Sequence, residues 1–182
     1  MNLGRAVPLS VLDLSILREG ATSADALAQT TALAQCAQDN DYHRFWVAEH
    51  HNMPSVACTT PPVLIAHLAG ATERIIIGSG GVMLPNHAPL VVAEQFAMLE
   101  ALHPGRIDVG IGRAPGTDQH TAGALRRSEG ALGAEDFPQD LFELMDLLGD
   151  RRFDTTIGDH FKATPAASSF PKIFLLGSSG YS

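Results

Sequence analysis

Four polar or glycine-rich segments contain the residues of this sequence that could do chemistry, and each follows an apolar run. In folds that alternate parallel strands with helices, binding sites form beyond the carboxyl ends of the strands. We therefore expect the four segments to meet at one site. They are residues 49–52 (EHHN), 78–81 (GSGG), 112–116 (GRAPG) and 177–179 (GSS).

The first segment, Glu49-His50-His51, suggests either a metal site or a proton-transfer group. Adjacent strand residues point to opposite faces, and the H-E-x-x-H spacing that puts two imidazoles on one helix face is absent, so we predict no metal site. His50 could instead take or give a proton near neutral pH, because an unperturbed histidine has a pKa of about 6.5. A purely structural histidine is the alternative that the residues alone leave open.

The glycine run and two arginines could serve a ligand. Gly78-Ser79-Gly80-Gly81 could form a turn or a bulge, or let a flat ligand approach the backbone closely. Arg106 and Arg113 lie on one predicted strand, about 23 Å apart at about 3.3 Å per residue, and thus at its opposite ends. We assign Arg106, at the amino end, to folding. Arg113, at the site end, could bind a phosphate with its forked guanidinium or form a surface salt bridge.

Nucleotide-binding and hydrolase motifs find little support in this sequence. Gly110, Gly112 and Gly116 nearly match the dinucleotide fingerprint, but the third glycine is one residue late and no predicted helix opens where the pyrophosphate would sit. A nicotinamide oxidoreductase is therefore only a weak alternative. The P-loop motif and a G-x-S-x-G elbow between a strand and a helix are both absent.

Strands and helices alternate along the chain and position these segments. The sequence predicts strands over residues 7–15, 44–49, 74–84, 106–112 and 172–176. It predicts helices from the Thr22 and Asp25 start signal to Asn40, through residues 63–71 after Pro61 and Pro62, and over 89–102 and 136–148. This alternation implies a parallel α/β fold, either a doubly wound sheet or an eight-stranded barrel. The length of 182 residues, taken alone, favours the doubly wound sheet, because complete barrels seldom have fewer than about 200 residues.

Composition excludes several classes of protein. The formal charge of −8, from 12 basic and 20 acidic residues, argues against sequence-independent binding to nucleic acid or to an anionic membrane. Hydrophobic residues at 45% and charged residues at 18% indicate a folded chain, for which we expect one domain over residues 1–182. The beginning of the sequence predicts a strand, not a signal peptide, and no stretch is a credible membrane span. Cys36 and Cys58 make no disulfide framework, which favours a reducing, cytoplasmic setting.

Taken in order, several motifs of this chain resemble the bacterial-luciferase-like flavin monooxygenases, from about Pro8 to the last residue. They are WVAEHHN, the proline-rich start of the second helix, LAGATERIIIGSGGVMLPNHAPLVVAEQFAMLEALHPGRIDVGIGRAPGTD and IFLLGSSG. The resemblance implies a TIM (β/α)8 barrel and so reverses the preference drawn from length. It also implies reduced FMN, supplied by a separate reductase, that reacts with O2 through a C4a-peroxyflavin to oxidise a small organic substrate. A deazaflavin is the less favoured cofactor.

The resemblance also implies roles for individual residues. His50 matches the active-site histidine beside the flavin. Ser79, Gly80 and Gly81 match the third-strand position, where the family often has a non-prolyl cis peptide beneath the isoalloxazine ring. Arg113, together with Ser178 and Ser179, matches positions that contact the FMN phosphate.

Only five of the eight barrel strands are predicted, so we expect a barrel truncated after its fifth strand. The strand spacing projects a complete chain of about 300 residues. Exposed strand edges would favour pairing with a second copy, so we expect a homo-oligomer. A non-catalytic remnant or partner subunit that binds flavin weakly is the alternative function.

Overall fold

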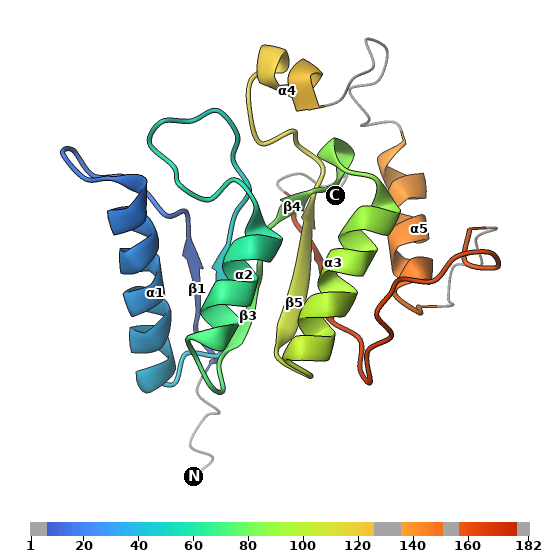
Figure 1. Ribbon diagram of the computed structural model, residues 1–182, viewed down its shortest axis with the longest axis horizontal. Coiled ribbons are helices and arrows are strands. Elements are labelled where there is room, and N and C mark those ends of the chain that lie inside the picture. The colour runs from blue at the N-terminus through green and yellow to red at the C-terminus, as the bar shows by residue number, and fades with distance from the viewer. Residues whose placement is uncertain (1–6, 126–135, 151–156, 178–182) are drawn as a thin grey trace.

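The computed structural model describes residues 7–125, 136–150 and 157–177, which form a parallel sheet with helices packed on one face (Figure 1). Each strand pair is parallel, and the path β1-β2-β3-β5 is joined on β5 by both β4 and β6. The predicted parallel α/β fold is therefore confirmed. The strands are β1 (Ser10–Asp13), β2 (Arg44–Val47), β3 (Ile76–Ser79), β4 (Val82–Met83), β5 (Ile107–Gly112) and β6 (Lys172–Leu175).

β3 and β4 are two halves of the single strand predicted over residues 74–84. Ile77 of β3 is in register with Ile107 of β5, and Val82 of β4 is in register with Ile111 further along the same strand. Between the halves lies the Gly80–Gly81 peptide, which is cis. The predicted strand is thus interrupted where the glycine run lies.

Four of the helices lie in the places that the sequence predicts. The Thr22 hydroxyl accepts a hydrogen bond from the Asp25 N–H, and the Asp25 carboxylate accepts one from the Thr22 N–H, which completes the predicted capping box. Prolines occupy the first turn of the next helices, where their missing N–H has no helical partner. The helices are α1 (Ser23–Asp39), α2 (Pro61–Gly70), α3 (Pro89–Leu102) and α5 (Phe137–Leu147).

Two short elements were not predicted. α4 (Gln119–Leu125) occupies a segment expected to be a loop, and the 3-10 helix η1 (Leu84–Asn86) follows β4. The Asp118 carboxylate accepts hydrogen bonds from the His120 and Thr121 N–H groups and so starts α4. No helix begins at residues 113–118 of the described chain, so the nicotinamide alternative lacks its pyrophosphate site and is wrong.

The core lies between the sheet and the helices. Along each strand every second side chain points to the helix layer, and those of Phe45, Val47, Ile77, Val109 and Ile111 are fully buried there. The buried helix residues that meet them include Ile65, Leu68, Phe96 and Leu144.

The opposite face of the sheet carries one layer of polar and aromatic side chains. The Asp108 carboxylate accepts a hydrogen bond from Arg44 Nε at 2.7 Å and from Trp46 Nε1 at 3.2 Å. The Phe174 ring lies edge-on to Trp46, with 5.0 Å between ring centres, and 5.3 Å from the Arg44 guanidinium carbon. Leu12, on the same face, is 54% exposed, so this face is only partly covered by the described residues.

Arg106 has the folding role predicted for the amino end of β5. Its guanidinium donates to the backbone oxygens of Ala69, Thr72 and Ile75 and to the Thr72 hydroxyl. It thereby ties the end of α2 to the start of β3. No helix of the described residues is long and apolar enough to cross a membrane.

A substitution at Gly110 tests how tightly β3 and β5 pack. A Cβ atom at Gly110 would overlap the Ser79 carbonyl oxygen, which is backbone and cannot turn away. We expect Gly110→Ala to lower the free energy of unfolding by about 3 kcal/mol in urea denaturation, near the upper end for overpacking. Gly123→Ala is the control, because a Cβ there meets nothing within 4 Å on α4 and should be neutral or stabilising. Equal stability of the two variants would contradict this packing.

Candidate functional site

Three of the four predicted segments meet at the carboxyl ends of β2, β3 and β5. The Glu49 N–H donates to the Gly81 carbonyl at 3.2 Å, and the His51 N–H donates to the Gly116 carbonyl at 3.3 Å. The Gly80 N–H donates to the Val47 carbonyl at 2.8 Å. In the fourth segment, Ser178 and Ser179 lie outside the described residues, so their predicted phosphate contact stays a prediction.

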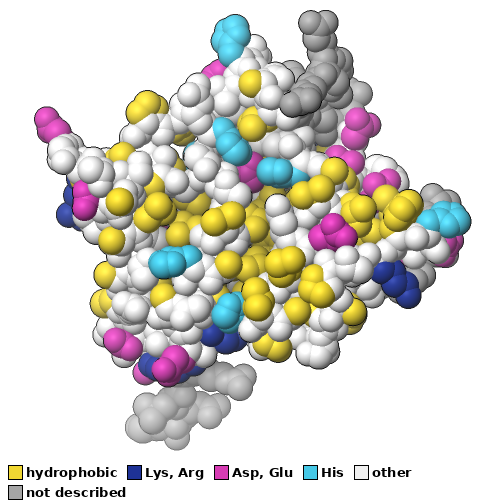
Figure 2. Space-filling view, viewed as in Figure 1, with side chains coloured by type: hydrophobic (Ala, Val, Ile, Leu, Met, Phe, Trp, Pro, Cys, Tyr) yellow, Lys and Arg dark blue, Asp and Glu magenta, His cyan; other side chains and the backbone are white. Residues whose placement is uncertain are grey.

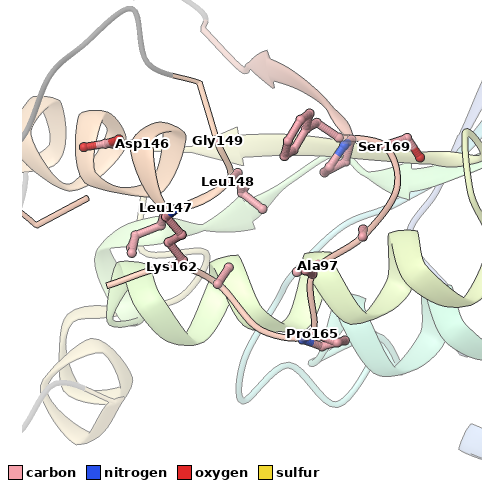
Figure 3. A pocket seen from close by; sticks show the side chains of 13 residues that line it. Ala97, Asp146, Leu147, Leu148, Gly149, Lys162, Pro165 and Ser169 are labelled. Carbon is pink, nitrogen blue, oxygen red and sulfur yellow. The ribbon is translucent and has the colours of Figure 1, made fainter. Parts of the chain in front are cut away.

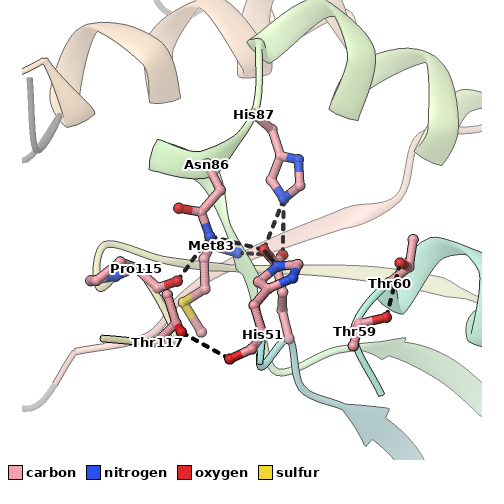
Figure 4. Close-up of polar contacts among 9 residues, drawn as sticks. His51, Thr59, Thr60, Met83, Asn86, His87, Pro115 and Thr117 are labelled. Carbon is pink, nitrogen blue, oxygen red and sulfur yellow. Dashed lines mark hydrogen bonds and ion pairs between the residues drawn. The ribbon is translucent and has the colours of Figure 1, made fainter. Parts of the chain in front are cut away.

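Glu49 is the centre of this site, and Figure 4 labels four of the residues that bond to its carboxylate, which are His51, Met83, Asn86 and His87. Its side chain is 1% exposed, and Oε1 accepts hydrogen bonds from His51 Nε2 at 2.7 Å, His87 Nε2 at 2.9 Å and Asn86 Nδ2 at 3.1 Å. Oε2 accepts from the Met83 N–H at 2.9 Å and lies 3.1 Å from His87 Nε2. The carboxylate is therefore surrounded by donors from two separate segments.

The pKa of Glu49 is lowered despite its burial. Burial is the largest single effect and acts to raise the pKa, because it penalises the charged form. The hydrogen bond and charge of His87, the hydrogen bond from His51 and that from the Met83 N–H together outweigh it. Glu49 is thus ionised at neutral pH.

The sequence predicts a role for Glu49 only as part of the Glu49-His50-His51 segment, which suggests either a metal site or a proton-transfer group. It predicts no role for Asn86 or His87. The signal for Glu49 was present, because period-two alternation puts it on the same face as the buried Phe45 and Val47. A carboxylate at such a position requires buried donors. The sequence does not reveal that those donors come from η1 and the residue after it.

His50 lies between Glu49 and His51 but makes neither of their hydrogen bonds. It is half-buried, its N–H donates to the Cys58 carbonyl at 3.2 Å, and its Nδ1 is buried with no hydrogen-bond partner among the described residues. A buried imidazole nitrogen without a partner is unfavourable unless a bound group completes it. The neighbouring Cys58 thiol is a poor nucleophile, because burial, then Glu49 and Asp13, raise its pKa to about 12.

The glycine run forms a closely packed wall beside these residues. A Cβ on Gly80 would lie 2.9 Å from Leu12 Cδ1 and 3.0 Å from Trp46 Cε3, and one on Gly81 would overlap Leu176 Cδ1. Only glycine fits at these two positions, because the side chains of Leu12, Trp46 and Leu176 already occupy the space that a Cβ would take. The Ser79 hydroxyl is buried, donates to the Gly110 carbonyl and accepts from the Gly110 N–H, so it ties β3 to β5.

Arg113 lies at the rim, directly after β5. Its side chain is exposed and makes no hydrogen bond or ion pair with any described residue. The salt-bridge alternative therefore finds no partner in the described part of the chain. The loop after it is held in place, because Asn86 Nδ2 donates to the Pro115 carbonyl at 2.9 Å and the Thr117 hydroxyl donates to the His51 carbonyl at 2.8 Å. Within the described part of the chain, the Arg113 guanidinium is thus available to bind an anion. We call the site formed by the loops after β2, β4 and β5 the mouth of the sheet.

A separate cavity of about 260 Å³ lies between α3, α5 and the segment before β6 (Figure 3). It contains none of the predicted site residues. The described residues likewise form no metal centre, because no group of three or more histidine, cysteine or acidic side chains among them is arranged to hold a metal ion. The residues that line the cavity include Ala97, Leu147, Lys162, Pro165 and Ser169.

Comparison with known proteins defines the class. The family model described as luciferase-like monooxygenase matches residues 9–174, and the chain belongs to this family. It is 49% identical over 174 residues to the uncharacterised protein YvbT of Bacillus subtilis, covering 96% of this chain and 50% of that protein. It is 45% identical to a luciferase-like monooxygenase of Escherichia coli K12, with 98% and 52% covered. It is also 45% identical to N-acetyl-S-alkylcysteine monooxygenase of B. subtilis, with 95% and 52% covered.

Solved structures agree with the sequence relatives. Apo-MsnO8 matches with a TM-score of 0.84 and 39% identity, covering 95% of this chain and 50% of that one. The oxygenating constituent of 3,6-diketocamphane monooxygenase of Pseudomonas putida, solved with FMN, shares the fold at a TM-score of 0.74 and 18% identity, with 94% and 51% covered. The chain therefore spans about half the length of its relatives and forms part of a TIM barrel. The doubly wound fold favoured by length alone is wrong.

The pH dependence of stability tests the ionised state of Glu49. A carboxylate whose folded pKa is lowered stabilises the protein above its ordinary pKa of 4.5, and this contribution is lost as the pH falls through the folded pKa. Relative to wild type, Glu49→Gln should lower the free energy of unfolding by about 3 kcal/mol near pH 7. Urea unfolding should show this difference shrinking below about pH 4.

The matched control is Glu19→Gln, which removes an exposed carboxylate in the loop before α1 and should show no such difference. A difference between wild type and Glu49→Gln that stays constant from neutral to acid pH would contradict an ionised, hydrogen-bonded Glu49.

Proposed function

We propose that this chain supplies the flavin-binding part of an FMN-dependent monooxygenase that uses O2 to oxidise a small organic substrate. One juxtaposition carries the proposal. The Gly80–Gly81 wall is hydrogen-bonded to the backbone of Val47 and Glu49, directly before His50, whose Nδ1 is buried without a partner among the described residues. Arg113, which has no partner among the described residues, directly follows β5, the strand that pairs with β4 after this wall. The class of the chain, a luciferase-like monooxygenase, agrees with that chemistry.

The residues at this site could bind both the flat ring and the phosphate of FMN. The wall at Gly80 and Gly81 would take the flat ring, and Trp46 and Leu12 would border it with apolar surface. Arg113 would bind the phosphate through paired charge-assisted hydrogen bonds, with Ser178 and Ser179 as further predicted contacts. Reduced FMN supplies the electrons that activate O2 when it is bound.

His50 would hold or move the proton that the oxidation requires. Its Nδ1 is shielded from water, and its main-chain N–H donates to the Cys58 carbonyl, which holds the backbone of this residue in place. Histidine is the side chain that most often serves as a general acid or base in enzymes. This role depends on the ring reaching the cofactor or the substrate.

The monooxygenase relatives support FMN over a deazaflavin as the proposed cofactor. Monooxygenase relatives at 45% identity favour a cofactor that reacts with O2, and one structural neighbour was solved with FMN. An F420-dependent secondary alcohol dehydrogenase shares the fold at a TM-score of 0.63 and 18% identity. We therefore propose FMN, with a deazaflavin as the second candidate.

Partners and setting are also proposals. A separate reductase would supply reduced FMN, and two unpaired cysteines, Cys36 and Cys58, fit a reducing cytoplasm.

Figure 2 shows apolar side chains over the helix face, where exposed residues of α2 and α3 favour association with a second copy. These residues are Val63, Val91, Met98 and Leu102. A non-catalytic partner subunit is the alternative function, because the chain spans about half of its relatives.

Flavin titration with a phosphate-free analogue tests the proposal. Arg113→Gln should weaken FMN binding by about 10- to 100-fold, the range for losing charge-assisted hydrogen bonds to phosphate. Binding of riboflavin, which lacks the phosphate, should change less than about twofold. Flavin fluorescence reports both affinities, for this chain and for a version extended to barrel length.

Arg74→Gln is the matched control, because Arg74 is an exposed arginine before β3, at the amino end of the sheet, and pairs with Asp41. It should leave both affinities unchanged. Equal weakening of FMN and riboflavin by Arg113→Gln, or no weakening of either, would contradict the proposed phosphate contact. If neither chain bound any flavin, the proposed function itself would be wrong.

A further inference from the structure

The hydrogen bonds of the Glu49 carboxylate join loops that follow different strands of the sheet. His51 belongs to the segment after β2, and Met83, Asn86 and His87 belong to the segment between β4 and α3. Asn86 Nδ2 donates both to Glu49 Oε1 and to the Pro115 carbonyl, which brings in the loop after β5. One buried carboxylate therefore has direct or one-step contact with three loops.

The acceptor-only character of a carboxylate fixes the protons on both histidines. An ionised Glu49 cannot donate, so His51 Nε2 and His87 Nε2 must each carry a hydrogen. Both contacts lie at or below 2.9 Å, in the range of charge-assisted hydrogen bonds. The ring positions and the Nε2–H form of both histidines thus depend on Glu49.

The two residues given functional roles lie beside this network without belonging to it. His50 lies between Glu49 and His51 in the chain. Arg113 lies two residues before Pro115, whose carbonyl is held by Asn86, and Gly116 packs so closely on Glu49 that a Cβ there would lie 2.8 Å from the Glu49 carbonyl oxygen. A shift of Glu49 would therefore displace both functional segments.

We propose that Glu49 is the positioning residue of this site, which holds His51 and His87 as Nε2–H donors and thereby fixes His50 and Arg113 relative to one another. The part of this inference that concerns cofactor alignment rests on the proposed function. The part that concerns the two imidazoles is independent of the proposed function, and the two parts have different tests.

The matched comparison is Glu100, a second buried carboxylate. Glu100 is fully buried and accepts hydrogen bonds from the Gly105 N–H and the Ser169 hydroxyl, at the far end of α3 from the mouth. Glu100→Gln replaces a buried carboxyl group as Glu49→Gln does, but Glu100 has no hydrogen bond to His51 or His87. Any general effect of losing a buried carboxylate should appear in both variants.

The direct test is nuclear magnetic resonance of the chain labelled with 15N-histidine, which carries 8 histidines. Hydrogen bonding to a buried carboxylate slows exchange with water, so we expect two ring N–H protons downfield of the amide envelope, from His51 and His87. Both resonances should vanish in Glu49→Gln and persist in Glu100→Gln. Single His51→Gln and His87→Gln variants assign them. Persistence of both resonances in Glu49→Gln would overturn the proposal.

If Glu49→Gln does not fold, His87→Gln decides the same question. Because His51 and His87 share Oε1 of Glu49, removing the His87 ring should delete one resonance and shift the other. An unshifted His51 resonance would show that the two imidazoles are independent and would overturn the proposal.

The affinity for FMN tests the alignment. Displacing a binding group by about 1 Å costs on the order of 100-fold, so Glu49→Gln should raise the Kd for FMN at least about tenfold, and Glu100→Gln should leave it within about twofold. Loss of both resonances with an unchanged Kd would overturn the alignment of Arg113. Wild-type chain that shows the resonances but binds no flavin would instead refute the proposed function.

Discussion

The buried carboxylate of Glu49 is the interaction on which the mouth of this sheet depends. It is almost completely buried, and its charge is retained there because donors from two segments surround it. Removing any one donor leaves less compensation for a charge that is costly to bury. The loops after β2, β4 and β5 are therefore constrained together, although they are far apart in sequence.

The two faces of the sheet carry different kinds of side chain. The face under the helices is filled by Phe45, Ile77 and Ile111 and supplies the core. The other face has the Arg44, Trp46 and Asp108 cluster near the amino ends of the strands and the glycine wall near their carboxyl ends. This arrangement matches the division in TIM barrels, where the carboxyl ends carry chemistry and the amino ends carry stability.

The sequence was sufficient for features with a local cause. Short-range rules explain the capping box at Thr22 and the prolines that open α2 and α3. They also explain why Arg106 and Arg113 lie at opposite ends of β5. Other features depend on tertiary contacts or on knowledge of the whole chain. The break between β3 and β4 depends on packing against β5, and the pairing of Glu49 with His87 spans 38 residues. Length misled because the chain spans about half of its relatives, so a size limit for complete barrels did not apply.

A crystal structure of the chain with FMN would test the central claim, that the mouth formed by β2, β4 and β5 is a flavin site. We predict the ring against Gly80 and Gly81, with its edge within reach of His50, and the phosphate at the Arg113 guanidinium. FMN bound elsewhere, as in the cavity between α3 and α5, with the mouth empty and His50 Nδ1 still unpartnered, would contradict it.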